Sequence, residues 1–303
     1  MIAVSVLIPT FRRPDEFLRA ARSVLRQRDV ADIEIIAIDN SPEGSAARAF
    51  QTFAAESPLP FRFAHEPRPG VAQARNAALA LAQGRLIAWL DDDEEAAPTW
   101  LAALMRVRRQ TGAQSVFGPV RAAAPAGATH AAFYERIYSR TGPQRSGLID
   151  KPHGMGNSLQ PRAMFESDAP FDARTDQSGG EDDALFASWA EAGARFAWAH
   201  DAIVTEHIDK KRAHVMHGLR RAFAYGQGPC ELAWSAQDYL SLARHIGVGA
   251  AQAALYGAAS ALLAPVSRTQ ALGLLDRAVR GAGKVLWFVE QRFYGEALAR
   301  QPA

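Results

Sequence analysis

Five consecutive acidic residues, Asp91–Glu95, follow an apolar stretch in AWLDDDEEAAPTWL. Like charges crowded at the end of a buried strand are unfavourable unless a positive group neutralises them. In an extended segment Asp91 and Asp93 can point the same way and share one divalent cation, while Asp92 faces elsewhere. A Mg²⁺ or Mn²⁺ held in this way completes its shell with substrate phosphate oxygens. The alternative is a solvated acidic turn before the helix expected after Pro98, because helix starts favour acidic residues.

A second acidic cluster follows two glycines in SGGEDDALFASW. Glu181, Asp182 and Asp183 open an expected helix, and N-terminal capping alone could explain them. A flexible Gly-Gly loop would also present these acids at the mouth of the helix, where a general base could meet an acceptor. Together the two clusters indicate a metal site and a proton acceptor.

The stretch PRPGVAQARNAALALAQGRLIAWLDDD connects a turn and a helix to the first acidic cluster. Gly70 allows a close approach of the backbone, and Arg75 and Asn76 fall early in the helix. There they could meet phosphate or base groups together with unpaired helix amides. The alternative is an ordinary surface arginine on an amphipathic helix.

Strands alternate with helices over the first 90 residues. Short apolar runs typical of strands buried on both faces occupy residues 3–9, 33–39, 61–66 and 85–90. The alternation predicts an α/β fold with an open, mostly parallel sheet flanked by helices, whose ligands gather beyond the carboxyl ends of the strands. Asp39 and Asp91 both fall at such ends.

The regular alternation of strands and helices ends near residue 115, and helical patterns dominate near the C-terminus. We expect strands over 115–120, 154–161 and 195–208, a loop-rich segment over 125–147 and a helix over 181–193. Three further helices are expected over 231–247, 249–266 and 273–300. The uncharged segment 249–266 is short for a membrane span, and the basic and aromatic segment after it favours a packed or membrane-surface helix.

Composition places the chain in the ordinary soluble class. Of its 303 residues, 48% are hydrophobic and 22% are charged. The net charge of +2 gives no reason to expect a nucleic acid partner. Cys230 is the only cysteine, which excludes an intramolecular disulfide, and the N-terminus lacks the features of a signal peptide. We therefore expect a location on the cytoplasmic side.

The ordered motifs SVLIPTFRR, IEIIAIDNSP, GVAQARNAALALAQGRLIAWLDDDE, GMGNSL and GGEDDALFASW resemble the family 2 glycosyltransferases with the GT-A fold. Within that family the chain is most similar to bacterial exopolysaccharide enzymes of the succinoglycan-glucosyltransferase type. The resemblance covers about residues 3–226. It implies a catalytic domain over residues 1–226 and a helical C-terminal extension over residues 227–303 that could associate with a membrane.

The resemblance also implies roles for residues of the donor site. Those that would contact the nucleotide or the sugar diphosphate are Pro9, Thr10, Phe11, Asp39, Arg75, Asn76 and Asp92. Among them, Asp39 would hydrogen-bond the base. Asp91 and Asp93 would form the D-x-D motif that binds the metal.

Two further roles concern the acceptor side. Asp182 matches the general base, and Glu181 would orient it or contact the acceptor. His207 falls where some relatives place another metal or phosphate ligand; the alternative is a partly buried histidine bonded to backbone. Asn40 departs from the family pattern, where many relatives carry a second Asp, so the base contact would rest on Asp39.

The resulting hypothesis is an inverting, metal-dependent transferase that moves a sugar from a nucleotide-diphosphate sugar, a UDP-sugar, to a glycan or lipid-linked acceptor. The chain lacks the Gln-x-x-Arg-Trp signature of processive relatives, which favours single additions. Peripheral membrane contact is expected through residues 231–303. Two alternatives stay open: a nucleotidyltransferase, although no Gly-rich loop with a Lys follows the first strand, and a glycan-assembly module without turnover.

Overall fold

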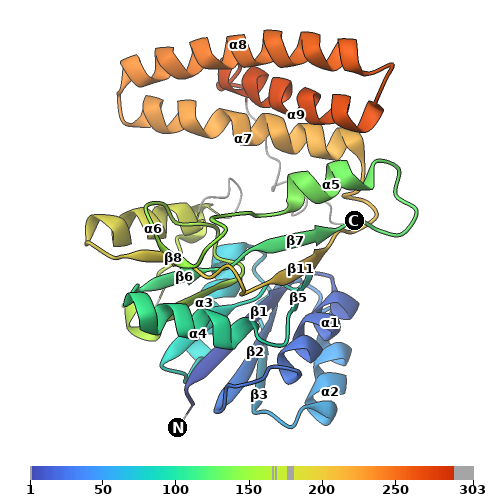
Figure 1. Cartoon of the computed structure of the whole chain (residues 1–303). Coiled ribbons are helices and arrows are strands. Elements are labelled where there is room, and N and C mark those ends of the chain that lie inside the picture. The colour runs from blue at the N-terminus through green and yellow to red at the C-terminus, as the bar shows by residue number, and fades with distance from the viewer. Residues whose placement is uncertain (1, 166, 168, 176–180, 290–303) are drawn as a thin grey trace. The chain divides into compact units, whose positions relative to one another are not determined.

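The computed structural model describes residues 2–165, 167, 169–175 and 181–289 (Figure 1). Internal contacts divide the chain into two units. Apart from the residues not described, the first unit comprises Met1–Arg121 and Ser139–His207, and the second comprises Ala122–Tyr138 and Ile208–Arg300.

The first unit is built on an eight-stranded sheet with the strand order β3-β2-β1-β4-β9-β6-β10-β8. Neighbours among β1 to β4 run parallel, as do β6 and β10, whereas β9 and β8 run antiparallel to the strands they pair with. The predicted mostly parallel sheet is confirmed. Its strands are β1 (Val4–Thr10), β2 (Ile33–Asp39), β3 (Phe61–His65), β4 (Leu86–Trp89), β6 (Ser115–Phe117), β8 (Gly147–Ile149), β9 (Ser158–Pro161) and β10 (Phe196–Trp198).

A three-stranded sheet with the order β5-β11-β7 carries part of the first acidic cluster. Its strands are β5 (Glu94–Ala96), β11 (Val204–His207) and β7 (Val120–Ala123). The interpretation of Asp91–Glu95 as a turn missed β5, because pairing with β11 overrides the low strand propensity of Glu. The single strand expected over 195–208 is two strands, β10 and β11, which belong to different sheets.

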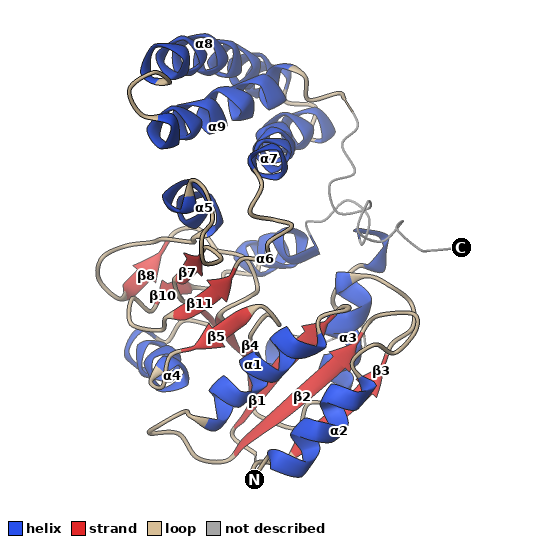
Figure 2. Ribbon diagram, turned by 90° about the vertical axis from the view of Figure 1, so that its right-hand side faces the viewer, coloured by secondary structure: helices blue, strands red, loops and turns tan. Residues whose placement is uncertain are grey.

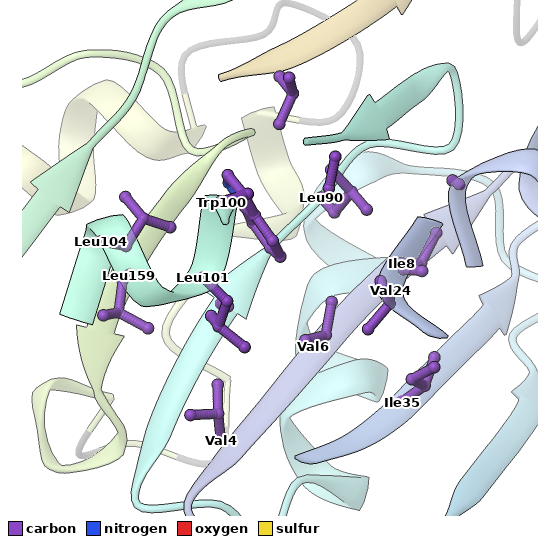
Figure 3. Packing of buried hydrophobic residues seen from close by; sticks show 14 of the residues in the cluster. Val4, Val6, Ile8, Val24, Ile35, Leu90, Trp100, Leu101, Leu104 and Leu159 are labelled. Atoms are coloured by element: carbon purple, nitrogen blue, oxygen red, sulfur yellow. The ribbon is translucent and has the colours of Figure 1, made fainter. Parts of the chain in front are cut away.

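Helices cover both faces of the large sheet (Figure 2). Alternate residues of β1 point to opposite faces, so Val4, Val6 and Ile8 pack on one side and Leu7 on the other. The first side, part of which Figure 3 shows, is covered by α1 (Pro14–Leu25), α2 (Ala47–Glu56) and α4 (Trp100–Thr111). The second side is covered by α3 (Val71–Leu81) and α6 (Glu181–Glu191). The parallel pairing of β1 with β2 and with β4 brings the carboxyl ends of these three strands to one edge of the sheet.

The second unit is helical, and its elements differ from the expected ones. It contains α5 (Ala131–Tyr138), α7 (Val215–Ser235), α8 (Tyr239–Leu263) and α9 (Arg268–Val285). Helix α5 lies in the segment expected to be loop-rich, and α8 runs without a break where separate helices were expected over 231–247 and 249–266. The expected boundary between residues 226 and 227 falls inside α7, whereas the two units divide at residues 207 and 208.

The remaining features are short helices and the properties of the C-terminal helices. Short 3₁₀ helices occupy Arg162–Met164 and Ala173–Thr175. Residues 290–300 of the last expected helix lie outside the described residues. Within the described part of the chain, α8 is the one helix whose length and composition would allow it to cross a membrane.

Candidate active site

The loop after β1 is tied to the acidic cluster through Asp92. The Thr10 hydroxyl donates to Asp92 Oδ2 at 2.7 Å, and the Phe11 amide donates to the same oxygen at 3.4 Å. Arg13 Nη1 donates to Asp92 Oδ1 at 3.0 Å and to Asp93 Oδ2 at 2.9 Å. Burial raises the pKa of Asp92 to about 6, although the Arg13 charge opposes the shift. Asp92 therefore points into the β1–α1 loop and positions Thr10 and Phe11, two of the predicted nucleotide contacts.

Asp91 lies against the loop that precedes β9. A Cβ added to Gly156 would overlap the Asp91 carboxylate, so any larger residue would have to displace that side chain. Burial raises the pKa of Asp91, and the charges of Asp93 and Asp182 act in the same direction, opposed by nearby arginines. Asp91, Asp93 and Asp182 are thus close enough for their charges to interact.

The 154–157 loop connects Asp91 to the second acidic cluster. Its Met155 amide donates to Asp182 Oδ2 at 2.9 Å, while Gly156 contacts Asp91. Asn157, fully buried with a left-handed φ of 51°, donates from Nδ2 to the carbonyls of Pro119 and Ala202. Asn tolerates this conformation better than most residues, which explains its place here. The 154–157 loop therefore positions both Asp91, a predicted metal ligand, and Asp182, the predicted general base.

Arg140 holds the same loop and was not singled out in the sequence. Its guanidinium donates to the carbonyl oxygens of Gly154 at 2.9 Å, Gly118 at 3.4 Å and Gly156. Burial lowers the pKa of Arg140. Four acids raise it in opposition: Glu94, Asp91, Asp182 and Glu206. Arg140 is thus a counter-charge among the acids, supplied by a segment without any sequence pattern that would mark it.

Arg75 and Glu181 form an ion pair at 2.6 Å, and both are at least nine-tenths buried. The Arg75 guanidinium also lies over the rings of Trp89 and Phe171, at 5.9 and 5.4 Å from their centroids. This contact joins α3 to the start of α6. The buried Arg75 Nε has no hydrogen-bond partner in the described structure. Arg75, predicted to hold the nucleotide, is thus paired with the acid predicted to assist Asp182.

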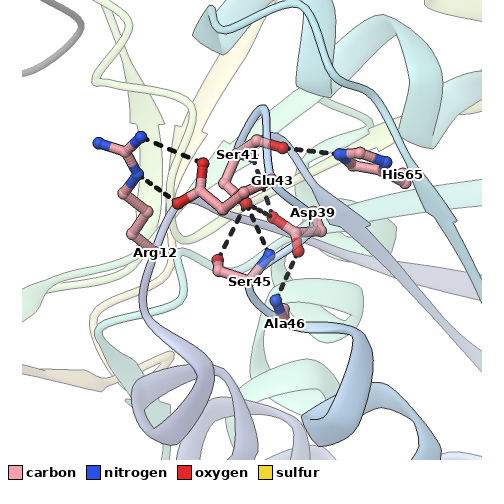
Figure 4. A network of polar contacts seen from close by, with 7 residues as sticks. All are labelled: Arg12, Asp39, Ser41, Glu43, Ser45, Ala46 and His65. Atoms are coloured by element: carbon pink, nitrogen blue, oxygen red, sulfur yellow. Dashed lines mark hydrogen bonds and ion pairs between the residues drawn. The ribbon is translucent and has the colours of Figure 1, made fainter. Parts of the chain in front are cut away.

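Asp39 ends β2 with its carboxylate turned into the following loop (Figure 4). Asp39 Oδ1 accepts from the amide and hydroxyl of Ser41 at 2.9 and 2.7 Å, and Oδ2 accepts from the Ala46 amide at 2.5 Å. The carboxylate is 2% exposed. A contact between Asp39 and a nucleotide base would have to use the remaining lone pair of Oδ2 or displace the Ala46 amide.

Asn40 organises the turn before α3. Its Nδ2 donates to the carbonyls of Glu66 and Arg68 at 3.0 and 2.8 Å, and its Oδ1 accepts from the Gly70 amide at 2.7 Å. A second Asp at this position could not donate to two carbonyls. The departure from the family pattern therefore has a structural role that the sequence alone did not show.

Asn76 and His207, predicted to contact the nucleotide and the metal, bond to other protein groups in the described structure. Asn76 exchanges hydrogen bonds with the backbone of Phe171, donating to its carbonyl at 2.8 Å and accepting from its amide at 3.1 Å. His207 Nε2 lies 3.0 Å from Glu95 Oε2, while the His207 amide donates to the Asp93 carbonyl. The His207 backbone therefore pairs with that of Asp93, while the His207 ring interacts with the Glu95 carboxylate.

The first acidic cluster fits a divalent cation that takes part of its shell from the substrate. Asp91 and Asp93 offer hard carboxylate oxygens, and their mutual repulsion would be relieved by a cation. Among the described residues no group of three or more His, Cys, Asp or Glu side chains could hold a metal. Two carboxylates suit Mg²⁺, which keeps waters and takes further oxygens from substrate phosphates.

The chain that carries these residues belongs to a known enzyme family. The model of glycosyl transferase family 2 matches residues 5–165, more than half of the chain, and the chain belongs to that family. It is a glycosyltransferase, as the sequence motifs predicted.

Individual relatives agree with this assignment. The chain is 29% identical over 292 residues to the succinoglycan biosynthesis protein ExoM of Rhizobium meliloti (strain 1021), covering 93% of this chain and 91% of that protein. Mannosyltransferase PcManGT from Pyrobaculum calidifontis, solved in complex with GDP-Man and Mn²⁺, superposes with a TM-score of 0.64 at 19% identity, over 95% of this chain and 88% of the other. S. aureus TarS 1-349 in complex with UDP gives a TM-score of 0.54 at 15% identity, over 98% and 91%. The predicted GT-A fold is confirmed by these structural neighbours.

Proposed function

We propose that the chain is an inverting, metal-dependent glycosyltransferase of bacterial polysaccharide biosynthesis. It moves a sugar from a nucleotide-diphosphate sugar, a UDP-sugar, to a glycan or lipid-linked oligosaccharide. The acceptor class is supported by the relative named for succinoglycan biosynthesis, and the donor class by neighbours solved with GDP-Man and with UDP. The enzyme acts on the cytoplasmic side, with peripheral contact to the membrane.

The observation that carries the proposal is the proximity of three carboxylates around one loop. Asp91 and Asp93 follow β4, Asp182 lies in the first turn of α6, and the 154–157 loop contacts both Asp91 and Asp182. A displacement reaction needs a stabilised leaving group on one side of the anomeric carbon and a base on the other. The acids after β4 and on α6, each in contact with the same loop, supply both requirements.

In this reaction Asp182 accepts the proton of the acceptor hydroxyl. Its oxygens accept from the amides of Met155 and Asp183, which orient the carboxylate and leave lone pairs for the hydroxyl. The acceptor oxygen forms a bond to the anomeric carbon while the bond from that carbon to the diphosphate oxygen breaks. The configuration inverts, and a nucleoside diphosphate leaves with the electron pair.

Asp91 and Asp93 would hold the cation, with His207 as a candidate further ligand once its ring leaves Glu95. Bound there, a Mg²⁺ or Mn²⁺ neutralises charge that develops on the diphosphate. Thr10 and Phe11, fixed by Asp92, and Pro9 beside them line the side where the nucleotide base and ribose bind. Arg75 and Glu181 join α3 to α6 and so keep Asp182 in register with the donor residues.

Product analysis tests the proposal. The protein is incubated with Mn²⁺, a panel of UDP- and GDP-sugars and lipid-linked saccharide acceptors, and the products are separated and examined by NMR. A nucleoside diphosphate and a glycoside of inverted anomeric configuration are expected. Release of pyrophosphate would instead identify nucleotidyl transfer, and a retained configuration would overturn direct displacement. Nucleotide binding without turnover on any acceptor would favour an assembly module.

A further inference from the structure

Helix α8 of the second unit exposes large apolar side chains along its whole length. The largest exposed fractions are 85% for Leu240, 81% for Leu262 and 71% for Leu255. Only 11% of the most apolar 18-residue window of this helix is buried. A contiguous apolar face of this kind on a soluble protein marks an interaction surface. We call it the α8 face.

The opposite side of α8 buries Leu242 near its start, and the small residues Gly249 and Ser260 where it packs on α9. Helix α9 packs against both α7 and α8 (Figure 1). A Cβ added to Gly249 would meet the Gly281 carbonyl and Lys284 Cβ at 2.6 to 2.7 Å, so α8 and α9 approach closely through glycines. The Ser260 hydroxyl donates to the Ala271 carbonyl at 2.8 Å in the same contact. Small residues between helices and large apolar residues outside are typical of helices in contact with lipid.

Charge around the α8 face is mainly positive. No acidic residue occurs in the sequence between Asp238, which caps α8, and Asp276. Over residues 238–289 there are five Lys or Arg side chains and two Asp, a formal charge of +3. Arg244 and Arg268 lie near the two ends of α8, and both are exposed. The surface is therefore complementary to an anionic partner that is flat and apolar beneath its charges.

Aromatic rings gather at the end of α8 that adjoins α7. Trp234 contacts Tyr239 and Trp287, with centroid distances of 5.8 and 5.3 Å, and Trp287 contacts Phe288 at 6.2 Å. Trp234, Tyr239 and Phe288 are each more than half exposed. Trp and Tyr rings favour the level of lipid headgroups, because they combine an apolar ring with a polar group.

From these observations we infer that the α8 face lies flat on an anionic lipid bilayer and anchors the enzyme there. A second copy of the chain is a poorer occupant. Two α8 faces brought together would gather Arg244 and Arg268 of both copies at one interface against Asp238 of each, an excess of positive charge. Spanning by α8 is also disfavoured, since α9, which packs on it, carries Arg277, Arg280 and Lys284. This inference deepens the peripheral membrane contact of the proposed function by naming its surface and lipid, and it does not depend on the transfer reaction.

Vesicle flotation with the full chain tests the inference. Vesicles of phosphatidylcholine alone are compared with vesicles that contain phosphatidylglycerol, at low and high salt. The wild type should float with the anionic vesicles, and less so at high salt because screening weakens the attraction. Leu255→Glu/Leu262→Glu should weaken the binding by about 100-fold, since each leucine contributes roughly a factor of ten when buried in lipid. Leu148→Glu, in the first unit with its side chain 56% exposed, is the matched control and should bind like the wild type.

Each contrary outcome is distinguishable. Absence of binding to anionic vesicles by the folded wild type overturns the inference, and so does equal binding by the double variant. A dimer in solution that the double variant dissociates, with no vesicle binding, would assign the α8 face to a second copy. UDP binding measured on the same proteins reports the first unit separately, so failure of the donor site and failure of the α8 face cannot be confused.

Discussion

Replacing Arg140 with methionine should destabilise the first unit strongly. The substitution removes the partly buried positive charge near Asp91, Glu94, Asp182 and Glu206, together with the donors to the carbonyls of the 154–157 loop. Removing this charge and its hydrogen bonds costs about 3 kcal/mol, because the carbonyls and acids left behind lose a partner. With total stabilities of about 5 to 15 kcal/mol, that loss is a large share of the free energy of unfolding.

Urea denaturation of wild type and Arg140→Met measures this loss through the midpoint and the slope of the transition. The same loss in the free energy of unfolding should lower the thermal midpoint by about 10 °C. Arg140→Lys keeps the charge but cannot donate to three separate carbonyls in a fixed plane, so an intermediate loss is expected. Arg145→Met, at an exposed site five residues further on, should stay within about 0.5 kcal/mol. A loss of less than about 1 kcal/mol for Arg140→Met would refute the role of Arg140 as a counter-charge.

Three further predictions concern the site and its surroundings. Asp182→Asn should keep nucleotide binding and lower transfer by about 100-fold or more, and full transfer in this variant would remove Asp182 from the role of base. Gly156→Ala should displace Asp91 and weaken metal-dependent UDP binding by about tenfold, whereas Gly147→Ala, where an added Cβ would meet nothing within 4 Å, should have little effect in the same titration. Burial lowers the pKa of His153 from 6.5 to about 4, so the folded state binds fewer protons than the unfolded state between these values and stability falls as pH drops through 6.5. His153→Gln should reduce the difference in urea stability between pH 7 and pH 5 by about 1 kcal/mol, allowing for partial exposure, and an unchanged difference would contradict this effect.

The central strands could be predicted because their residues are apolar almost without interruption. Strand β2 spans Ile33–Asp39 as predicted, and all seven of its residues are buried. Strand β5 could not be predicted in this way, since Glu94 and Glu95 become strand residues only by pairing with β11. Helix α8 was divided in the prediction at its glycines, although Gly249 lies inside the helix and allows close packing on α9.

The types of the site residues could be predicted better than their orientations. The sequence indicated acids at the end of one strand and at the start of one helix. The structure brings the charges of Asp91, Asp93 and Asp182 close enough to interact. Whether Asp39 or Asn76 faces a ligand depends on contacts with Ala46 and Phe171, residues that no local pattern relates to them. The roles of Arg140 and Asn40 likewise depend on backbone carbonyls of other segments, which a residue pattern does not reveal.

Calorimetric binding of UDP, GDP, CDP and ADP, each with and without Mn²⁺, tests the central claim most directly. Wild type is compared with Asp91→Ala/Asp93→Ala and with Glu191→Ala, a control at an exposed acid of α6. We predict that UDP binds in the presence of Mn²⁺, that Glu191→Ala binds it equally, and that the double variant loses the metal-dependent binding while remaining folded. Binding of no nucleotide by folded wild type, or undiminished binding by the double variant, would contradict a metal-dependent donor site at Asp91 and Asp93.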